Sequence, residues 1–238
     1  MSNVHHARLV HRQQLAGAIF ELGFELVEEP PLRFRAGQFI SLRVGEDAAG
    51  DPVLRSYSIA SSSGSPRLAL IVRLIPGGVA STLLGGLALG DVVRFTGPMG
   101  FFVLDLQHAG DVVFGATGTG IAPVLPMLDE LLARPEPGRI FVLWGNRYAD
   151  DLFWQSELAE RQARSARLIV RTFLTQPPDE WRGERGRIAQ PLVDLVKQLD
   201  KPVYYLVGNG AMIREVKAAL QAAGLDRRKQ IRNEAFFG

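Results

Sequence analysis

The feature that most constrains the fold is the regular alternation of apolar runs and amphipathic segments after residue 110. Four continuous apolar runs predict buried strands: 111–115, 139–145, 166–174 and 202–208. Helical patterns follow each of them, at 121–133, 151–165, 189–199 and 211–223, and 230–236 predicts a last strand. Such alternation predicts a doubly wound α/β domain, with a parallel sheet covered by helices on both faces.

The first hundred residues follow a different pattern. Short apolar runs separated by turn residues lie at 39–44, 54–60, 68–74 and 92–96, and a short helix is predicted at 79–84. Short strands at this spacing predict an antiparallel barrel or sandwich. A polar segment at 104–110 separates the two patterns, so we expect two domains, at 1–106 and 107–238.

Composition excludes several classes of protein. There is no cysteine, so the chain has no disulfide and no cysteine-ligated zinc or iron–sulfur site. The net charge is only +2, and no basic stripe carries interleaved aromatics, so nucleic acid is not an expected partner. We expect no membrane span and no signal peptide, which fits the cytoplasm. None of the four histidines has metal-ligand spacing, so no metal is expected.

Two motifs in the first half suit a phosphate-bearing ligand with a flat ring. In Arg55-Ser56-Tyr57-Ser58, strand alternation puts Arg55 and Tyr57 on one face, where they could hold a phosphate and stack on a ring. The alternative is a plain solvent-facing strand. In the stretch 75–82, two glycines precede a predicted helix start, which is a natural phosphate site, or else a capped tight turn. We interpret Gly97-Pro98-Met99-Gly100-Phe101 as a rigid turn that closes the last barrel strand.

Two glycine-rich loops in the second half join a predicted strand to a predicted helix. The first, 115–123, reads GATGTGIAP and has the setting of a dinucleotide-binding loop, with Pro123 in the first helical turn. The second, 205–213, reads YLVGNGAMI and lies at the carboxyl end of a parallel strand, where ligands bind in open α/β sheets. A plain strand-to-helix turn is the alternative for the second loop.

The order of these five motifs resembles the ferredoxin–NAD(P) reductase superfamily over nearly the whole chain. The resemblance implies a six-stranded antiparallel β-barrel that binds FAD, followed by the α/β domain that binds NAD(P)H. It also implies an oxidoreductase in which the nicotinamide hands a hydride to FAD across a cleft between the domains.

The resemblance assigns roles by position. Arg55 and Ser81 would contact the FAD pyrophosphate, Tyr57 would lie against the flavin ring, and Ser58 would bind near the ring nitrogen that receives the hydride. Tyr57, Ser58 and Glu234 are the implied catalytic residues. The implied FAD contacts are Arg55, Ser56, Tyr57, Ser58, Val72, Gly77, Gly78, Ala80, Ser81 and Thr82. The implied nucleotide and ring contacts are Gly118, Thr119, Gly120, Pro123, Arg147, Gly208, Asn209, Met212, Phe236 and Phe237.

The sequence departs from the family at two positions. Members often carry cysteine where this chain has Val207, so thiol chemistry is not required here. Members that prefer NADP often have a Ser/Thr-Arg pair after the third strand, where this chain reads Leu174-Thr175-Gln176-Pro177. Without that arginine a 2′-phosphate lacks a bidentate partner, which favours NADH, although Arg147, Arg182 and Arg185 could substitute.

Three functions follow as hypotheses. The first is a reductase that passes electrons from NAD(P)H through FAD to a separate ferredoxin, flavodoxin or oxygenase component, because a chain without cysteine holds no cluster of its own. The second is a free-flavin reductase, for which flavin is a substrate. The third, of another class, is a non-catalytic flavin- or nucleotide-binding subunit of a redox complex.

Overall fold

A computed structural model describes residues 4–27, 32–135 and 138–236. The chain divides into two compact units. The first comprises Met1–Leu104 with Ala122–Glu130, and the second comprises Asp105–Ile121 with Leu131–Gly238. Each unit is described by itself below.

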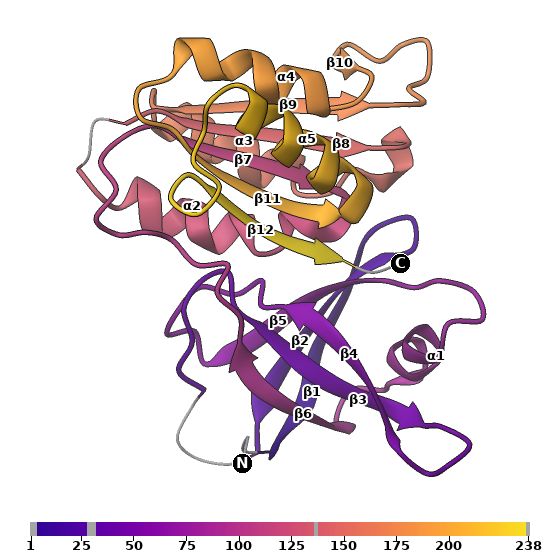
Figure 1. Cartoon of the computed structure of the whole chain (residues 1–238). Coiled ribbons are helices and arrows are strands. Elements are labelled where there is room, and N and C mark those ends of the chain that lie inside the picture. The colour runs from indigo at the N-terminus through magenta and orange to yellow at the C-terminus, as the bar shows by residue number, and fades with distance from the viewer. Residues whose placement is uncertain (1–3, 28–31, 136–137, 237–238) are drawn as a thin grey trace. The chain divides into compact units, whose positions relative to one another are not determined.

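The first unit is a six-stranded antiparallel barrel (Figure 1). Its strands are β1 (Val4–Ala16), β2 (Ile19–Leu26), β3 (Phe39–Glu46), β4 (Pro52–Ser58), β5 (Arg67–Arg73) and β6 (Val92–Met99), in the order β4-β3-β6-β1-β2-β5. An antiparallel bridge between Ile59 and Leu70 joins the ends of the order, and the Ala60 amide donates to the Ala69 carbonyl (2.8 Å). The expected barrel is therefore confirmed.

The apolar runs located four of these strands, and the structure adds β1 and β2 from the first thirty residues. Their outward side chains are polar or charged, and two register shifts interrupt the pairing of β1 with β2, so no clean alternation marks them in the sequence. Three histidines lie on β1. The turn predicted at 97–101 is wrong for its first three residues, because Gly97, Pro98 and Met99 continue β6 and Met99 pairs with Phe39; the strand ends there, and the chain bends at Phe101.

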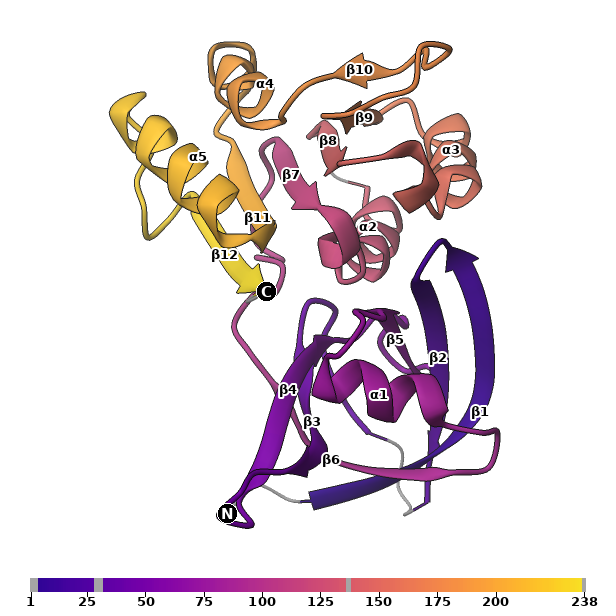
Figure 2. The ribbon, with the colours of Figure 1, turned by 90° about the vertical axis from the view of Figure 1, so that its right-hand side faces the viewer.

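Alternate side chains of the barrel strands fill its core, together with Leu84 from helix α1 (Val79–Gly86). The helix packs against β3 (Figure 2). Most of helix α2 (Val124–Leu132) also belongs to this unit by its contacts. The Ser63 hydroxyl donates to the Glu130 carboxylate (2.7 Å), and Met127 packs beside Gly37.

The second unit contains an all-parallel sheet, as expected. Its strands are β7 (Val112–Thr117), β8 (Ile140–Asn146), β9 (Leu168–Leu174), β10 (Glu184–Arg185), β11 (Val203–Asn209) and β12 (Ile231–Phe236), in the order β10-β9-β8-β7-β11-β12. From β7 the chain builds the sheet first toward β10 and later toward β12. The strand order therefore reverses between β7 and β11, and the carboxyl edge at such a reversal is where open α/β sheets bind ligands.

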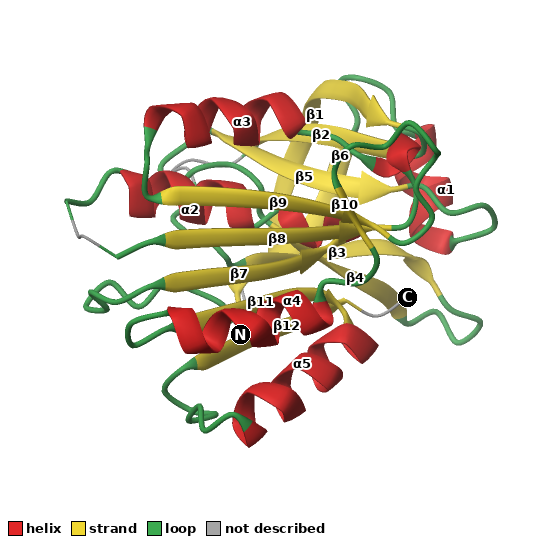
Figure 3. Cartoon of the chain, turned by 90° about the horizontal axis from the view of Figure 1, so that it is seen from above, coloured by secondary structure: helices red, strands yellow, loops and turns green. Residues whose placement is uncertain are grey.

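Helices lie on both faces of this sheet (Figures 2 and 3). Helix α3 (Gln155–Arg164) packs on β9, while α4 (Ala189–Asp194) and α5 (Gly210–Ala222) cover the opposite face and contribute Leu192, Ile213 and Val216 to its core. Short 3₁₀ segments η1 (Gly118–Ile121), η2 (Ala149–Asp151) and η3 (Leu195–Gln198) complete the unit. Because β7, β8 and β11 are buried on both faces, they read as continuous apolar runs in the sequence.

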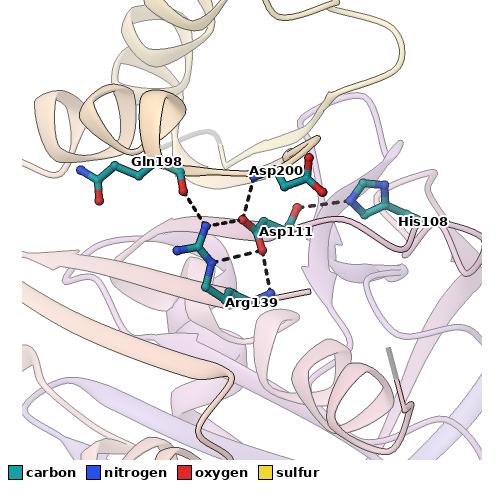
Figure 4. Close-up of polar contacts among 5 residues, drawn as sticks. All are labelled: His108, Asp111, Arg139, Gln198 and Asp200. Atoms are coloured by element: carbon teal, nitrogen blue, oxygen red, sulfur yellow. Dashed lines mark hydrogen bonds and ion pairs between the residues drawn. The ribbon is translucent and has the colours of Figure 1, made fainter. Parts of the chain in front are cut away.

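Buried Asp111 joins the amino ends of three strands (Figure 4). Its carboxylate, with a side chain 5% exposed, accepts hydrogen bonds from the Arg139 guanidinium (2.7 Å) and from the amides of Arg139 (2.7 Å) and Asp200 (2.9 Å). Burial alone would raise the pKa of Asp111, but these hydrogen bonds outweigh it and hold the pKa below its usual value. The network fastens β7 to the starts of β8 and β11, at the edge opposite the glycine loops.

Candidate functional site

Strand β4 carries the Arg-Ser-Tyr-Ser motif at one end of the strand order of the barrel. Arg55 and Ser56 are exposed, Tyr57 is half-buried against the barrel core, and Ser58 is 7% exposed. Burial raises the pKa of the Tyr57 hydroxyl, and the nearby Arg55 charge lowers it in part, so the net shift is upward. Tyr57 therefore stays a neutral phenol at neutral pH. The Arg55 guanidinium bonds the Leu54 carbonyl (2.8 Å) and is otherwise exposed.

Helix α1 begins at Val79, and its N-cap residue Gly78 has no side chain to offer, so the backbone N–H groups of the first turn have no side-chain cap among the described residues. Its other end is satisfied, because Arg12 donates to the carbonyls of Gly85 (3.1 Å) and Leu87 (2.9 Å). The Ser81 hydroxyl accepts the Ile75 amide (2.8 Å), which leaves its hydrogen available to donate. An open helix start with a spare hydroxyl fits a phosphate group.

The remaining barrel residues of the predicted site differ in what they offer. Thr82 donates its hydroxyl to the Gly78 carbonyl (3.1 Å), and Ala80 packs against the barrel core. Gly77, with φ +75°, leaves open space around its α-carbon. The Val72 side chain lies inside the core, 1% exposed, so only its main chain is available to a ligand.

The two glycine loops of the second unit interlock at the strand-order reversal. The Asn209 amide donates to the Thr117 hydroxyl (2.7 Å), and Gly208 (φ +113°) approaches so closely that a Cβ there would lie 2.4 Å from that oxygen. A Cβ at Gly120 would lie 2.9 Å from the Val207 carbonyl. These two glycines are therefore required for the loops to meet. By contrast, a Cβ at Gly118 meets nothing within 4 Å, so that backbone is open to a ligand.

Other predicted residues of these loops hold the two helix starts in place. The Asn209 side chain caps α5 by accepting from the amides of Ala211 (2.9 Å) and Met212 (3.1 Å). Pro123 is buried ahead of α2, and half-buried Thr119 lies in η1. The indole of Trp144, on β8, donates to the Gly118 carbonyl (2.9 Å) and so ties the first loop to the neighbouring strand.

The carboxyl ends of β8 and β9 meet beside the first glycine loop. Arg147 follows β8, stacks on Tyr148 (5.1 Å) and donates to the Gln176 side chain (3.2 Å). Gln176 occupies the place expected for the arginine of the NADP-preferring pattern. Exposed Arg185 follows on β10, and its Nη2 atom donates to three carbonyls of its own loop, including that of Asp179 (3.1 Å).

Asn146, the last residue of β8, was not singled out from the sequence. It is 6% exposed, and neither its Nδ2 nor its Oδ1 atom has a hydrogen-bond partner among the described residues. The only sequence signal is a polar residue that ends an otherwise apolar strand. Glu234 and Phe236, on β12, are both partly buried, and Phe236 pairs with Asn209. Phe237 lies outside the described residues.

The fold and these loops define a class of protein: an oxidoreductase with one unit for a flavin nucleotide and one for a pyridine nucleotide. Family models agree. The oxidoreductase FAD-binding domain matches residues 6–104, and the oxidoreductase NAD-binding domain matches residues 114–218. No group of three potential metal ligands gathers in the described part of the chain. Within the same residues, no helix has the length and apolar character to cross a lipid bilayer.

Similar proteins narrow this class to a family. A ferredoxin–NADP reductase of Sorangium cellulosum is 34% identical over 194 residues, which cover 81% of this chain and 79% of that protein. The reductase subunit of an Amycolatopsis aromatic O-demethylase is 39% identical over 136 residues, 55% of this chain and 40% of that protein. The crystal structure of the Amycolatopsis cytochrome P450 reductase GcoB, 30% identical, superposes with a TM-score of 0.86 and covers 98% of this chain and 70% of that one.

The chain belongs to the ferredoxin–NAD(P) reductase superfamily. Its cofactors are FAD and NAD(P)H, and it is an NAD(P)H-dependent flavoprotein oxidoreductase. Other curated relatives are longer, and the chain spans between 33% and 66% of their length.

Proposed function

We propose that this chain oxidises NADH and delivers the electrons to a separate one-electron carrier protein. The observation that carries this proposal is that the chain has two open binding edges. One is the uncapped start of α1, which fits a pyrophosphate, and the other is the exposed loop backbone at the carboxyl ends of β7 and β11, which fits a nucleotide. The chain also has no cysteine. When bound, FAD supplies the chemistry that accepts two electrons with a hydride and releases them singly. No iron–sulfur cluster can form on this chain, so the next carrier lies elsewhere.

We assign each predicted residue a task in this reaction. Arg55, Ser81 and the first-turn amides of α1 bind the FAD pyrophosphate, with Gly77 giving it room. Tyr57, as a neutral phenol, packs against the flavin ring. Ser58 hydrogen-bonds the ring near the nitrogen that receives the hydride. Glu234 and Phe236, on β12, keep the role that the resemblance implies for them.

The pyridine nucleotide lies along the carboxyl edge of the second unit. Its pyrophosphate contacts the Gly118–Gly120 backbone, and its nicotinamide contacts Thr119 and the loop from Gly208 to Met212. We keep the boundary near residue 106 between the FAD-binding and NAD(P)-binding domains as part of the proposal. The two family models, which end at residue 104 and begin at residue 114, support it.

The acceptor is a ferredoxin, a flavodoxin or an oxygenase component. Support comes from relatives whose names give such partners, a ferredoxin–NADP reductase and the reductase components of an aromatic O-demethylase and a phenol 2-monooxygenase. Direct comparison of candidate carriers in turnover with NADH identifies the one that this chain reduces.

Anaerobic mixing with NADH tests the proposal. We expect purified protein to stay yellow through desalting, to lose its flavin absorbance on NADH addition, and to reduce an added ferredoxin in turnover. A colourless protein that turns over riboflavin or FMN would instead be a free-flavin reductase. A flavin spectrum that NADH leaves unbleached would indicate a non-catalytic binding subunit.

The preference for NADH follows from Gln176. Its amide carries no charge for a 2′-phosphate, and its Oε1 atom accepts a hydrogen bond from the guanidinium of Arg147. We expect kcat/KM to favour NADH, and we expect Gln176→Arg to raise kcat/KM for NADPH by about tenfold through a charged, bidentate contact. Gln190→Arg, at an exposed glutamine on α4, is the matched control and should change neither value. A wild-type preference for NADPH would contradict this assignment.

A further inference from the structure

The Asn146 amide is a buried polar group left without a partner. Its backbone carbonyl is satisfied, because it accepts the Thr175 amide (3.1 Å), but neither side-chain atom is paired among the described residues. Asn209, on the same edge of the sheet, has its Oδ1 atom engaged in capping α5. Native proteins rarely leave a buried amide unpaired, since each such group costs stability, and the exceptions gather at functional sites.

The position of Asn146 indicates which group it serves. β8 is the immediate neighbour of β7, whose following loop exposes the Gly118 backbone, and adjacent strands lie about 4.8 Å apart. In a dinucleotide, a ribose is bonded directly to the pyrophosphate. A pyrophosphate at the end of β7 therefore places a ribose near the end of β8, on the side away from β11 and the nicotinamide loop.

We propose that Asn146 binds the ribose hydroxyls of the adenosine half of the pyridine nucleotide, an inference that rests on the proposed function. An asparagine amide offers a donor and an acceptor at once. Adjacent ribose hydroxyls each donate and accept, so one can give its hydrogen to Oδ1 while the other accepts from Nδ2. A neutral amide also tolerates a 2′-phosphate better than a carboxylate would.

The amide is sealed in the free protein, so binding has to uncover it. The next two residues along the chain, Arg147 and Tyr148, are exposed and stacked on one another, and Arg147 is held by Gln176. The proposal therefore requires these neighbouring exposed side chains to move so that a ribose can reach Asn146. The free protein thus keeps an unpaired amide whose hydrogen bonds form only with nucleotide.

The test uses fragments of the nucleotide with the FAD-loaded protein. We expect Asn146→Ala to weaken ADP-ribose binding by about tenfold, to leave nicotinamide mononucleotide binding unchanged, and to hold or raise the melting temperature of the free protein. Asn146→Asp keeps an acceptor but adds a charge, so it should weaken 2′-phospho-ADP-ribose more than ADP-ribose. Calorimetric titration measures each dissociation constant. Asn233→Ala, at an exposed asparagine on β12, is the matched control and should change none of them.

Two results would overturn the inference. If Asn146→Ala kept its ADP-ribose affinity and lost stability, the amide would pair with a buried water only. Equal weakening of both fragments would indicate general damage to the edge. The proposed function is tested separately, by whether NADH bleaches the flavin of the wild-type protein. A failure of the proposed function can therefore be distinguished from a failure of the Asn146 assignment.

Discussion

At the residue scale, the proposed FAD site depends on two side chains of β4 that face different surroundings. Arg55 is exposed and donates to the neighbouring Leu54 carbonyl, whereas Tyr57 packs against the barrel core. An exposed guanidinium is available for a bidentate contact with a pyrophosphate. A half-buried tyrosine has its ring orientation fixed by packing, which suits it to support a flat cofactor.

Removing these side chains should weaken FAD retention to different extents. We expect Arg55→Ala to raise the FAD dissociation constant by one to two orders of magnitude, roughly the loss of a charge-assisted pair, and Tyr57→Ala by a smaller factor. The measurement is flavin released on dilution, followed by fluorescence. Arg43→Ala, on the neighbouring strand where Arg43 pairs with Glu46, is the control and should retain FAD like the wild type. Unchanged affinity in both β4 variants would refute the placement.

At the element scale, the two ends of α1 differ in whether side chains satisfy their free backbone groups. Arg12 satisfies the carbonyls at its C-terminal end, while its first-turn amides have no side-chain cap. The Gly78 position holds this end open: a Cβ there would lie 3.2 Å from the Ser81 hydroxyl oxygen and 3.3 Å from the Ile75 carbonyl oxygen.

Gly78→Ala should therefore displace the Ser81 hydroxyl and weaken FAD binding by about tenfold, with a change of less than about 1 kcal/mol in the unfolding free energy. Equilibrium titration with FAD and urea unfolding measure the two effects. Gly86→Ala, at the other end of α1 where a Cβ meets nothing within 4 Å, should leave FAD affinity unchanged. Equal FAD affinity in Gly78→Ala and wild type would remove the argument for this cradle.

At the scale of the whole molecule, the second unit carries its proposed ligand groups at one edge of the sheet and its main polar fastening at the other. Asp111 joins the amino ends of β7, β8 and β11, and the interlocked loops join β7 to β11 at the carboxyl ends. Strands fixed at both ends present the loop backbones in a defined geometry. We therefore expect the Asp111 network to affect ligand binding only indirectly, through the positions of the strands.

Breaking the fastening should destabilise this unit in a pH-dependent manner. Asp111→Ala should lower its unfolding free energy by about 2–4 kcal/mol at pH 7, because it leaves buried amides and Arg139 without their acceptor. The folded pKa of Asp111 lies below the unfolded value of about 3.9, so its contribution is full above that pH and disappears as the pH falls through the folded pKa. The difference between variant and wild type should therefore shrink below about pH 4.

Urea unfolding followed by tryptophan fluorescence measures this effect selectively, since Trp144, Trp154 and Trp181 all lie in the second unit. Glu184→Ala breaks the more exposed pair with Arg171 and should cost less than about 1 kcal/mol. An Asp111→Ala loss that stayed constant from pH 7 to pH 3 would show that charge plays no part in the fastening.

Local patterns predicted much of this molecule. The doubly buried strands β7, β8 and β11 read as unbroken apolar runs, and glycines marked the loops that end β7 and β11. By contrast, the sequence pattern did not predict β1 and β2, because their outward residues are polar and their pairing is irregular. Asn146 was not predicted as a site residue, because polar residues are common at strand ends. Only its burial and its unpaired side-chain atoms, which the sequence does not show, distinguish it.

The sequence alone determined the two patterns of secondary structure, the order of the motifs and the absence of thiol ligands, because these depend on residue type and short-range periodicity. Tertiary structure decided which loops meet, that Gln176 engages Arg147, and that most of α2 packs with the barrel unit. Those outcomes depend on contacts between residues far apart in the chain, and the free energy of such contacts comes from burial and close approach, which no local window of sequence contains.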